Sequence, residues 1–278
     1  MPEPTCWTVA IDETAAAWNL LDWIGGEMSA GDRVELLTVH EHLGQTTERI
    51  TSRLAIAARR LRHHHPDVQV EQSVVDGATV ARVLADAAAS DILVIGGRRS
   101  GQFWAAITGR IAERLVAHVT VPVVVVPEHW TPGEQAPVVM GVDGRTATAA
   151  LTFAADRAER RGADLVLIRA WEPPTSISPF GRVYLARDSG HWEHESQLEL
   201  DAAIRAVSAA HPDLRMRGEL HQGTPADVLL RGEGTASMLV IGRRHRTALG
   251  AFLTGSVGEK LLHRGRSPVC VVPPVDHG

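Results

Sequence analysis

The sequence contains an internal repeat, and this repeat limits the folds open to the chain more than any other feature. Three motifs recur with the same offset of 146 residues: Leu-Val-Ile-Gly (93–96 and 239–242), His-Pro-Asp (65–67 and 211–213) and Thr-Gly (108–109 and 254–255). Near the start of each copy the offset is 131, because Val-Ala-Ile-Asp at 9–12 matches Met-Gly-Val-Asp at 140–143. Two such copies indicate a tandem duplication of one structural unit.

The two copies divide the 278 residues into two domains of ordinary size. We expect domain 1 at residues 1–127, a linker at 128–136 and domain 2 at 137–278. The offset grows by 15 residues within the second copy, which indicates an insertion there. Residues 172–190 are rich in Pro, Ser and Gly, so we expect the insertion to form a loop.

In each copy, short apolar segments alternate with longer amphipathic ones. Valine and isoleucine are frequent in the expected strands of the first copy, at residues 5–12, 33–40, 68–75, 91–96 and 121–126. Nearly continuous hydrophobicity is typical of strands that are covered on both faces. Apolar residues spaced by three and four predict helices between the strands, for example at 15–29 and 46–65. The fold class is therefore α/β, with two tandem domains that are each a five-stranded parallel sheet flanked by helices.

Composition excludes several classes of protein. Hydrophobic residues make up 44% of the chain and charged residues 22%, which is typical of a globular protein. A net charge of −5 argues against a broad nucleic-acid-binding surface. The longest apolar stretch, 119–126, is too short to span a membrane, and residues 1–4 do not resemble a secretory signal. Cys6 and Cys270 both fall in expected strands as small core residues, which fits a reducing, cytoplasmic setting. Taken together with the charge and the apolar stretches, this leads us to expect a cytoplasmic protein with no membrane or nucleic-acid partner.

Ligands of parallel α/β sheets bind at the carboxyl ends of the strands, which directs attention to the loops there. In the second copy the fourth strand ends at Gly242, and Gly255, Ser256 and Val257 open the helix that follows. A glycine lets the backbone approach an anion, while a hydroxyl and a helix N-terminus add favourable contacts. The pattern is neither a Walker loop nor a dinucleotide fingerprint. From spacing alone, an ordinary strand-end turn is the simpler interpretation.

Together with this spacing, the opening segment 139–144 and the closing segment 268–272 resemble the universal stress protein family, specifically its tandem members. The resemblance covers both halves of the chain outside residues 172–190. It implies a five-stranded parallel sheet in each domain. In one subset of the family, with the pattern Gly-x2-Gly-x9-Gly-Ser/Thr, it also implies ATP bound without obvious turnover.

The resemblance implies a nucleotide site in domain 2. Gly242, Gly255 and Ser256 match the phosphate loop, followed by Val257, but His245 replaces the second glycine. The resemblance places Asp143, with Gly141 before it, near the adenosine, and the backbone of Ala170 against adenine. Mg²⁺ would bridge the phosphates. Arg243 and Arg244 beside the loop either steer an acidic ligand or are solvated surface residues.

Domain 1 departs further from the family pattern. Gly96 and Gly109 match, but Arg99 stands at the second glycine and Arg110 at the serine. Arg110 either supplies charge to a phosphate or fills the phosphate position. Two further positions of domain 1 are candidates for contact with a nucleotide: Asp12, which corresponds to Asp143, and Val39, which corresponds to Ala170. We expect the first site to be mostly empty.

The last strand of each copy is an edge that would invite pairing if it were left open. In the family, these strands commonly pair across a two-fold axis. We therefore predict that 122–127 meets 268–273 within the chain, which makes a pseudo-dimer whose halves are related by a pseudo-two-fold axis. The sequence is also compatible with a homodimer of two such chains, in addition to this pairing within one chain.

Histidine clusters are the obvious candidates for metal ligands, and we expect no metal site. His63, His64 and His65 diverge around a helix, and His191 and His194 lack a third ligand nearby. The sequence also shows no paired nucleophile and base, so we expect no catalytic residues. The resulting hypothesis is a regulatory module of the stress response that binds ATP in domain 2 and signals to an unidentified protein partner. The alternatives are a ligand-free scaffold and a slow ATPase.

Overall fold

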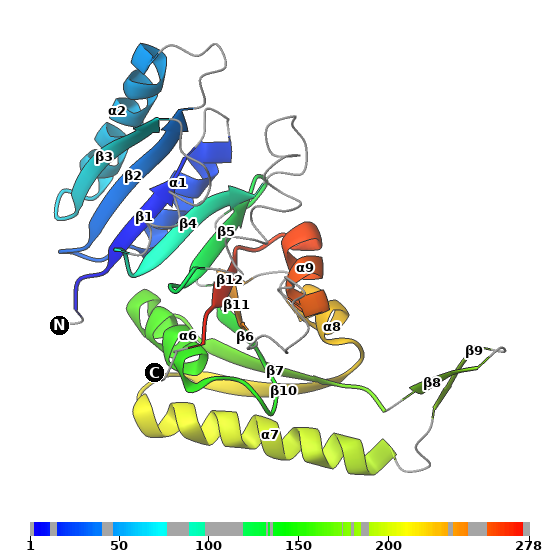
Figure 1. The fold of residues 1–278 in the computed structure, drawn as a ribbon. Coiled ribbons are helices and arrows are strands. Elements are labelled where there is room, and N and C mark those ends of the chain that lie inside the picture. Colours follow the sequence, from blue (N-terminus) through cyan, green and yellow to red (C-terminus); the bar gives the residue numbers. More distant parts are fainter. Residues whose placement is uncertain are drawn as a thin grey trace.

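Figure 1 shows the computed structural model of the chain. It describes residues 3–11, 16–40, 47–76, 89–97, 119–131, 133, 136–173, 175–178, 181–184, 189–232, 236–243 and 255–274. Within these residues, no helix is both long enough and apolar enough to cross a bilayer.

A single ten-stranded sheet runs through the molecule. In the first half the elements are β1 (Cys6–Ala10), α1 (Ala16–Glu27), β2 (Arg33–His40), α2 (Thr47–His64), β3 (Gln69–Asp76), β4 (Ile92–Gly97) and β5 (Val123–Pro127). In the second half they are β6 (Val138–Val142), α6 (Thr148–Arg161), β7 (Leu165–Trp171), β8 (Thr175–Ser178), β9 (Gly181–Tyr184), α7 (Ser189–Ala210), β10 (Met216–Gln222), α8 (Pro225–Gly232), β11 (Met238–Gly242), α9 (Gly255–Arg264) and β12 (Val269–Val272). The strand order is β10-β7-β6-β11-β12-β5-β4-β1-β2-β3.

The sheet consists of two five-stranded parallel halves that meet at β5 and β12. All pairs within each half are parallel, whereas β12 pairs antiparallel with β5, with Cys270 opposite Val124. The predicted fold class is thus confirmed, and so is the predicted pairing of 122–127 with 268–273. The structural reason is that this pair removes one open edge from each half, so that only β3 and β10 remain as edges of the described sheet.

The expected strands and helices of the first half agree with the structure to within a few residues at their ends. The insertion is different, because residues 172–190 are not simply a loop. They contain an antiparallel hairpin of β8 and β9, and α7 already begins at Ser189. Thr, Ile, Val and Tyr within 175–184 favour strands, a preference that the surrounding Pro, Ser and Gly had concealed.

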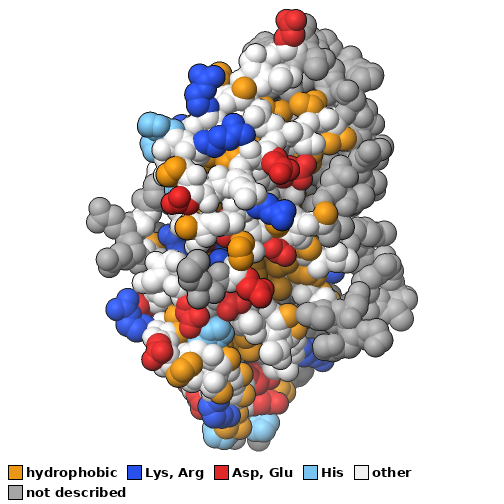
Figure 2. Space-filling model, turned by 90° about the vertical axis from the view of Figure 1, so that its left-hand side faces the viewer, with side chains coloured by type: hydrophobic (Ala, Val, Ile, Leu, Met, Phe, Trp, Pro, Cys, Tyr) orange, Lys and Arg blue, Asp and Glu red, His pale blue; other side chains and the backbone are white. Residues whose placement is uncertain are grey.

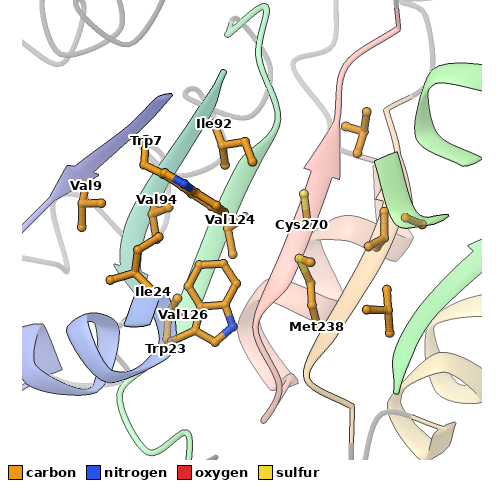
Figure 3. Packing of buried hydrophobic residues seen from close by; sticks show 14 of the residues in the cluster. Trp7, Val9, Trp23, Ile24, Ile92, Val94, Val124, Val126, Met238 and Cys270 are labelled. Atoms are coloured by element: carbon orange, nitrogen blue, oxygen red, sulfur yellow. The ribbon is translucent and has the colours of Figure 1, made fainter. Parts of the chain in front are cut away.

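Buried apolar side chains cover both faces of the sheet. On one face, residues of α1, α2, α6 and α7 form a core that continues across the β5–β12 boundary. Figure 3 shows Trp7, Trp23 and Val124 from the first half in the same layer as Met238 and Cys270 from the second. Burial raises the pKa of the Cys270 thiol, so this cysteine remains an inert core residue. Helices α8 and α9 contribute to a second core on the other face.

Polar contacts between the two halves are concentrated where α1 meets α6. Glu27, only 3% exposed, pairs with Arg161, and Arg157 lies over the ring of Trp7 at 5.2 Å. Burial raises the pKa of Glu27, although the two arginines oppose this shift. The acid therefore comes from domain 1 and the cations come from domain 2, which makes this contact asymmetric despite the repeat.

Candidate functional site

In domain 2 the carboxyl ends of three adjacent strands lie at one edge of the sheet. Val142 of β6 is paired with Arg169 of β7, and Gly141 is paired with Ile241 of β11. One step further along, Asp143, Ala170 and Gly242 therefore occupy the same edge. Helix α9 connects β11 to the parallel strand β12, so its first residue, Gly255, begins at this edge too. The structure thus brings together four of the residues predicted from the sequence.

Asp143 forms a tight turn directly after β6. Its Oδ1 accepts hydrogen bonds from the Arg145 backbone N–H (2.9 Å) and from the Thr146 hydroxyl (3.2 Å). The Thr146 Oγ1 in turn accepts from the Asp143 N–H at 2.8 Å. These bonds fix the orientation of the carboxylate before any ligand is present, as expected for an Asx turn.

Ala170 is buried, and a side chain from its own strand contacts its backbone. Nη1 of Arg169 donates to the Ala170 carbonyl, while Nε and Nη2 of the same guanidinium lie 2.7 Å from Oε2 of Glu199 on α7. Glu199 also lies against Gly144, where an added Cβ would be 2.2 Å from Oε1. The Arg169–Glu199 pair therefore links β7, α7 and the Asp143 turn.

Sequence reasoning missed this pair. One signal was present, since Arg169 is a charge within the otherwise apolar strand Leu-Val-Leu-Ile-Arg-Ala-Trp. Its partner, 30 residues away on α7, carries no local signal. Only the packing of α7 on β7 brings the two side chains together.

The glycines of the site have different physical roles. A Cβ on Gly141 would lie 2.8 Å from Cδ1 of Leu229, so α8 packs where that side chain would be. At Gly242 the nearest atom to an added Cβ is the Ala150 Cβ, at an ordinary 3.5 Å. Packing within the protein therefore accounts for Gly141 but does not require the glycine at 242.

The start of α9 supplies backbone N–H groups at the same edge. Gly255 and Ser256 are its first residues, and Val257 is half-buried against the second core. The four N-terminal N–H groups of a helix have no partner within it and carry partial positive charge. The Ser256 side chain and His245 lie outside the described residues.

Arg243, considered from the sequence as a residue that steers ligands, contacts domain 1 in the structure. Its Nη1 donates to the Val119 carbonyl at 2.8 Å, and its backbone N–H donates to the Val272 carbonyl at 2.7 Å. This side chain therefore helps to hold the two halves together. Arg244 lies outside the described residues.

The corresponding edge of domain 1 is only partly described. Gly96 lies in β4 opposite Val126, and Val39 lies in β2 opposite Val75. At the repeat position of Arg169, domain 1 has Thr38, whose hydroxyl donates to the Ile11 carbonyl at 2.9 Å. Four residues predicted from the sequence lie outside the described residues: Asp12, Arg99, Gly109 and Arg110.

Four of the five histidines considered for metal binding lie on the surface, and the fifth, His65, is half-buried at the end of α2. His63 and His64 are exposed at the end of α2, and His191 and His194 are exposed near the start of α7. The structure instead groups Asp156, Glu159 and His211, with one donor atom of each within 4.8 Å of the others. No local pattern in the sequence points to this cluster, because His211 is more than 50 residues from the two acids.

Comparison with known proteins identifies the family of this chain. The model of the universal stress protein family matches residues 8–127 and again residues 136–273. The chain belongs to this family. A universal stress protein of Mycolicibacterium smegmatis is 30% identical over 212 residues, which cover 73% of this chain and 69% of that relative. The chain spans about two thirds of the length of the mycobacterial relatives that it matches.

A solved structure of a universal stress protein shares the architecture over nearly the whole chain. It comes from Archaeoglobus fulgidus and has a TM-score of 0.72 over 99% of this chain and 98% of its own, at 17% identity. Another, from the same organism and in complex with dAMP, covers 49% of this chain and 97% of its own, with a TM-score of 0.37 and 20% identity. Proteins of this family are generally not classed as enzymes.

Proposed function

We propose that this tandem universal stress protein binds ATP in domain 2 without efficient turnover and acts as a cytoplasmic regulatory module. One observation carries the proposal: Asp143, Ala170, Gly242 and the start of α9 share one edge of the sheet. This is the edge at which open α/β sheets bind their ligands.

The chemistry along this edge suits the two ends of a nucleotide. The Asp143 carboxylate, oriented by its turn, can accept hydrogen bonds from ribose hydroxyls, and Ala170 offers a backbone edge to a base. At the other end, the N-terminus of α9 favours phosphate. Gly242 has no Cβ to obstruct a phosphate, and packing within the protein does not require a glycine there. Mg²⁺ would be held chiefly by the phosphates.

The state of the Ala170 carbonyl favours a second candidate, a ligand-free interaction scaffold. The Arg169 guanidinium already donates to this carbonyl, so a base that used the same acceptor would have to displace it. On this alternative, the edge is closed by the protein's own side chains, and partners recognise the surface without nucleotide.

Calorimetric titration of Mg·ATP into the purified full chain tests the proposal, once co-purified nucleotide has been excluded. We expect about one equivalent of ATP, bound in domain 2. Asp143→Asn and Ser256→Ala each remove one polar contact, which is worth about 1–3 kcal/mol or roughly 5- to 150-fold in affinity. Asp12→Asn is the matched control in domain 1 and should leave binding unchanged.

Two results would replace the proposal by its alternatives. No heat and no thermal shift at millimolar ATP would leave the scaffold. Continuous phosphate release that stops in Ser256→Ala would make the protein a slow ATPase. If nucleotide-loaded protein retains a partner that the Asp143→Asn variant does not, the regulatory role is supported.

A further inference from the structure

We propose that domain 2 carries a Zn²⁺ site between α6 and the end of α7, with Asp156, Glu159 and His211 as the protein ligands. Nδ1 of His211 lies 3.0 Å from Oε1 of Glu159, and Nε2 lies 3.9 Å from Oδ1 of Asp156. A donor atom from each residue lies within 4.8 Å of the other two.

Local structure holds the three ligands in place. Asp156 and Glu159 are three residues apart on α6, so they share one face of the helix. His211 follows α7 directly, where its N–H donates to the Val207 carbonyl (2.8 Å) and its own carbonyl accepts from the Leu214 N–H (3.2 Å). Its side chain is only 11% exposed, so the ring is confined between the two helices.

Comparison of the two repeats distinguishes the role of His211 in ending its helix from the role of the two acids beside it. In domain 1, His65 ends α2 with the same two backbone bonds, to Leu61 (2.8 Å) and from Val68 (3.2 Å). At the repeat positions of the two acids, however, domain 1 has Gly25 and Met28. A Cβ on Gly25 would lie 3.0 Å from Nε2 of His65, so this histidine packs against bare helix backbone.

This difference shows that the helix end needs the histidine but not the carboxylates. The two acids are an addition of domain 2, and both face a ring that domain 1 holds without them. A role in ending the helix therefore does not account for the acids. Both acids pair with the His211 ring, and the three groups together form a donor set that a cation can use.

The donor set selects the kind of cation. Zn²⁺ binds imidazole nitrogen and carboxylate oxygen at about 2.0–2.2 Å, often with three protein ligands and a water. In such a tetrahedron the ligand atoms are about 3.3–3.6 Å apart, so small side-chain rotations suffice here. Mg²⁺ and Ca²⁺ prefer oxygen ligands alone, which makes the imidazole a poor partner for them.

Two positive charges lie close to the cluster, those of Arg157 and Arg160 on α6. Both of these side chains contact domain 1: Arg157 lies over Trp7, and Arg160 donates to the Glu3 carbonyl. The side chains of Asp156 and Glu159 are 49% and 43% exposed, so a cation from solvent can reach them, and it would offset the repulsion between the two carboxylates.

Titration of ZnCl₂ into the metal-free full chain at neutral pH tests the site. We expect one equivalent at micromolar affinity and a higher unfolding temperature in the presence of Zn²⁺. Asp156→Asn and Glu159→Gln keep the shape of each side chain and should each weaken binding by about tenfold or more.

Three controls distinguish this site from Zn²⁺ bound elsewhere on the chain. His65→Gln changes the matched histidine of domain 1 and should leave Zn²⁺ binding unchanged. Zn²⁺ binding that survives in both Asp156→Asn and Glu159→Gln, or that is lost instead in a His191→Ala/His194→Ala variant, would overturn the proposal. Absence of Zn²⁺ binding in the unaltered chain, or equal binding of Mg²⁺, would also overturn it.

Discussion

The two domains share a backbone plan but differ in the side chains at corresponding positions. Domain 1 has Thr38 where domain 2 has Arg169, and it has Gly25 and Met28 where domain 2 has Asp156 and Glu159. Each difference creates a contact between elements in domain 2: Arg169 with Glu199, and the two acids with His211. The repeated backbone therefore accounts for the fold, and the unmatched side chains account for these contacts of domain 2. On the face shown in Figure 2, acidic and basic side chains are interspersed.

The largest expected effect concerns the asymmetric contact between the domains. Glu27 aligns with Ala158, and replacing it by alanine would leave Arg157 and Arg161 without their buried acid. We expect Glu27→Ala to lower the free energy of unfolding by about 3–5 kcal/mol, as measured by chemical denaturation. Asp22, whose pair with Arg60 is about 40% exposed on both sides, is the control. Asp22→Ala should cost less than about 1 kcal/mol, and equal losses in the two variants would contradict the expectation.

A second prediction concerns one matched strand position, which is residue 10 in β1 and residue 141 in β6. Domain 1 has Ala10 where domain 2 has Gly141. In Gly141→Ala the new methyl would overlap Leu229, at a distance of 2.8 Å, and we expect a loss of about 1–3 kcal/mol. Thermal unfolding of the variant, alone and combined with Leu229→Ala, measures the overlap. If the second substitution fails to reduce the penalty of the first, α8 is not its cause.

A third prediction makes the ligand edge of domain 2 resemble that of domain 1. Arg169→Thr places there the residue that Thr38 provides in domain 1, and it frees the Ala170 carbonyl. If ATP uses this carbonyl, affinity should rise by about tenfold, since one charge-assisted hydrogen bond no longer competes. Calorimetric titration of ATP into the Arg169→Thr and Glu199→Gln variants measures this change in affinity. Weaker binding in Arg169→Thr would show instead that the guanidinium holds the ligand.

The smallest effect concerns the start of α8. The Thr224 hydroxyl donates to Oδ2 of Asp227 at 2.6 Å, whereas domain 1 has Ala78 and Ala81 at these positions. We expect Thr224→Ala to lower stability by about 1 kcal/mol at neutral pH, as measured by urea denaturation. The hydrogen bond from Thr224 is the main cause of the lowered pKa of Asp227, so the folded state favours the ionised acid. This contribution is present above the ordinary pKa of an aspartate, about 3.9, and is lost as the pH falls through the lower folded value. A penalty that stayed constant down to pH 2 would contradict the role of Asp227.

Much of the fold followed from local pattern. Residues 92–95 and 123–126 are continuous apolar runs because both faces of a parallel strand are covered. The positions of such strands can therefore be predicted from the local sequence alone. Repeated glycines mark turns in the same way: Gly31 and Gly162 occupy matching positions, and both have positive φ, 89° and 62°. The hairpin of β8 and β9 escaped this reasoning, because its short strands are surrounded by residues typical of loops.

By itself, the sequence determined the tandem organisation, the parallel α/β architecture and the strand ends at which Asp143, Ala170 and Gly242 lie, whereas the pairing of β5 with β12 was expected from the resemblance to the family. These features depend on the spacing of apolar residues, on the internal repeat and on turn residues, all of which can be recognised in short segments of the sequence. Only the tertiary structure decided that Arg169 reaches Glu199, that Glu27 is buried beneath the arginines of α6, and that His211 faces two acids. Each of these contacts joins residues 30 to 134 positions apart. Their distance and burial are set by how helices pack on the sheet, which no local pattern of residues records.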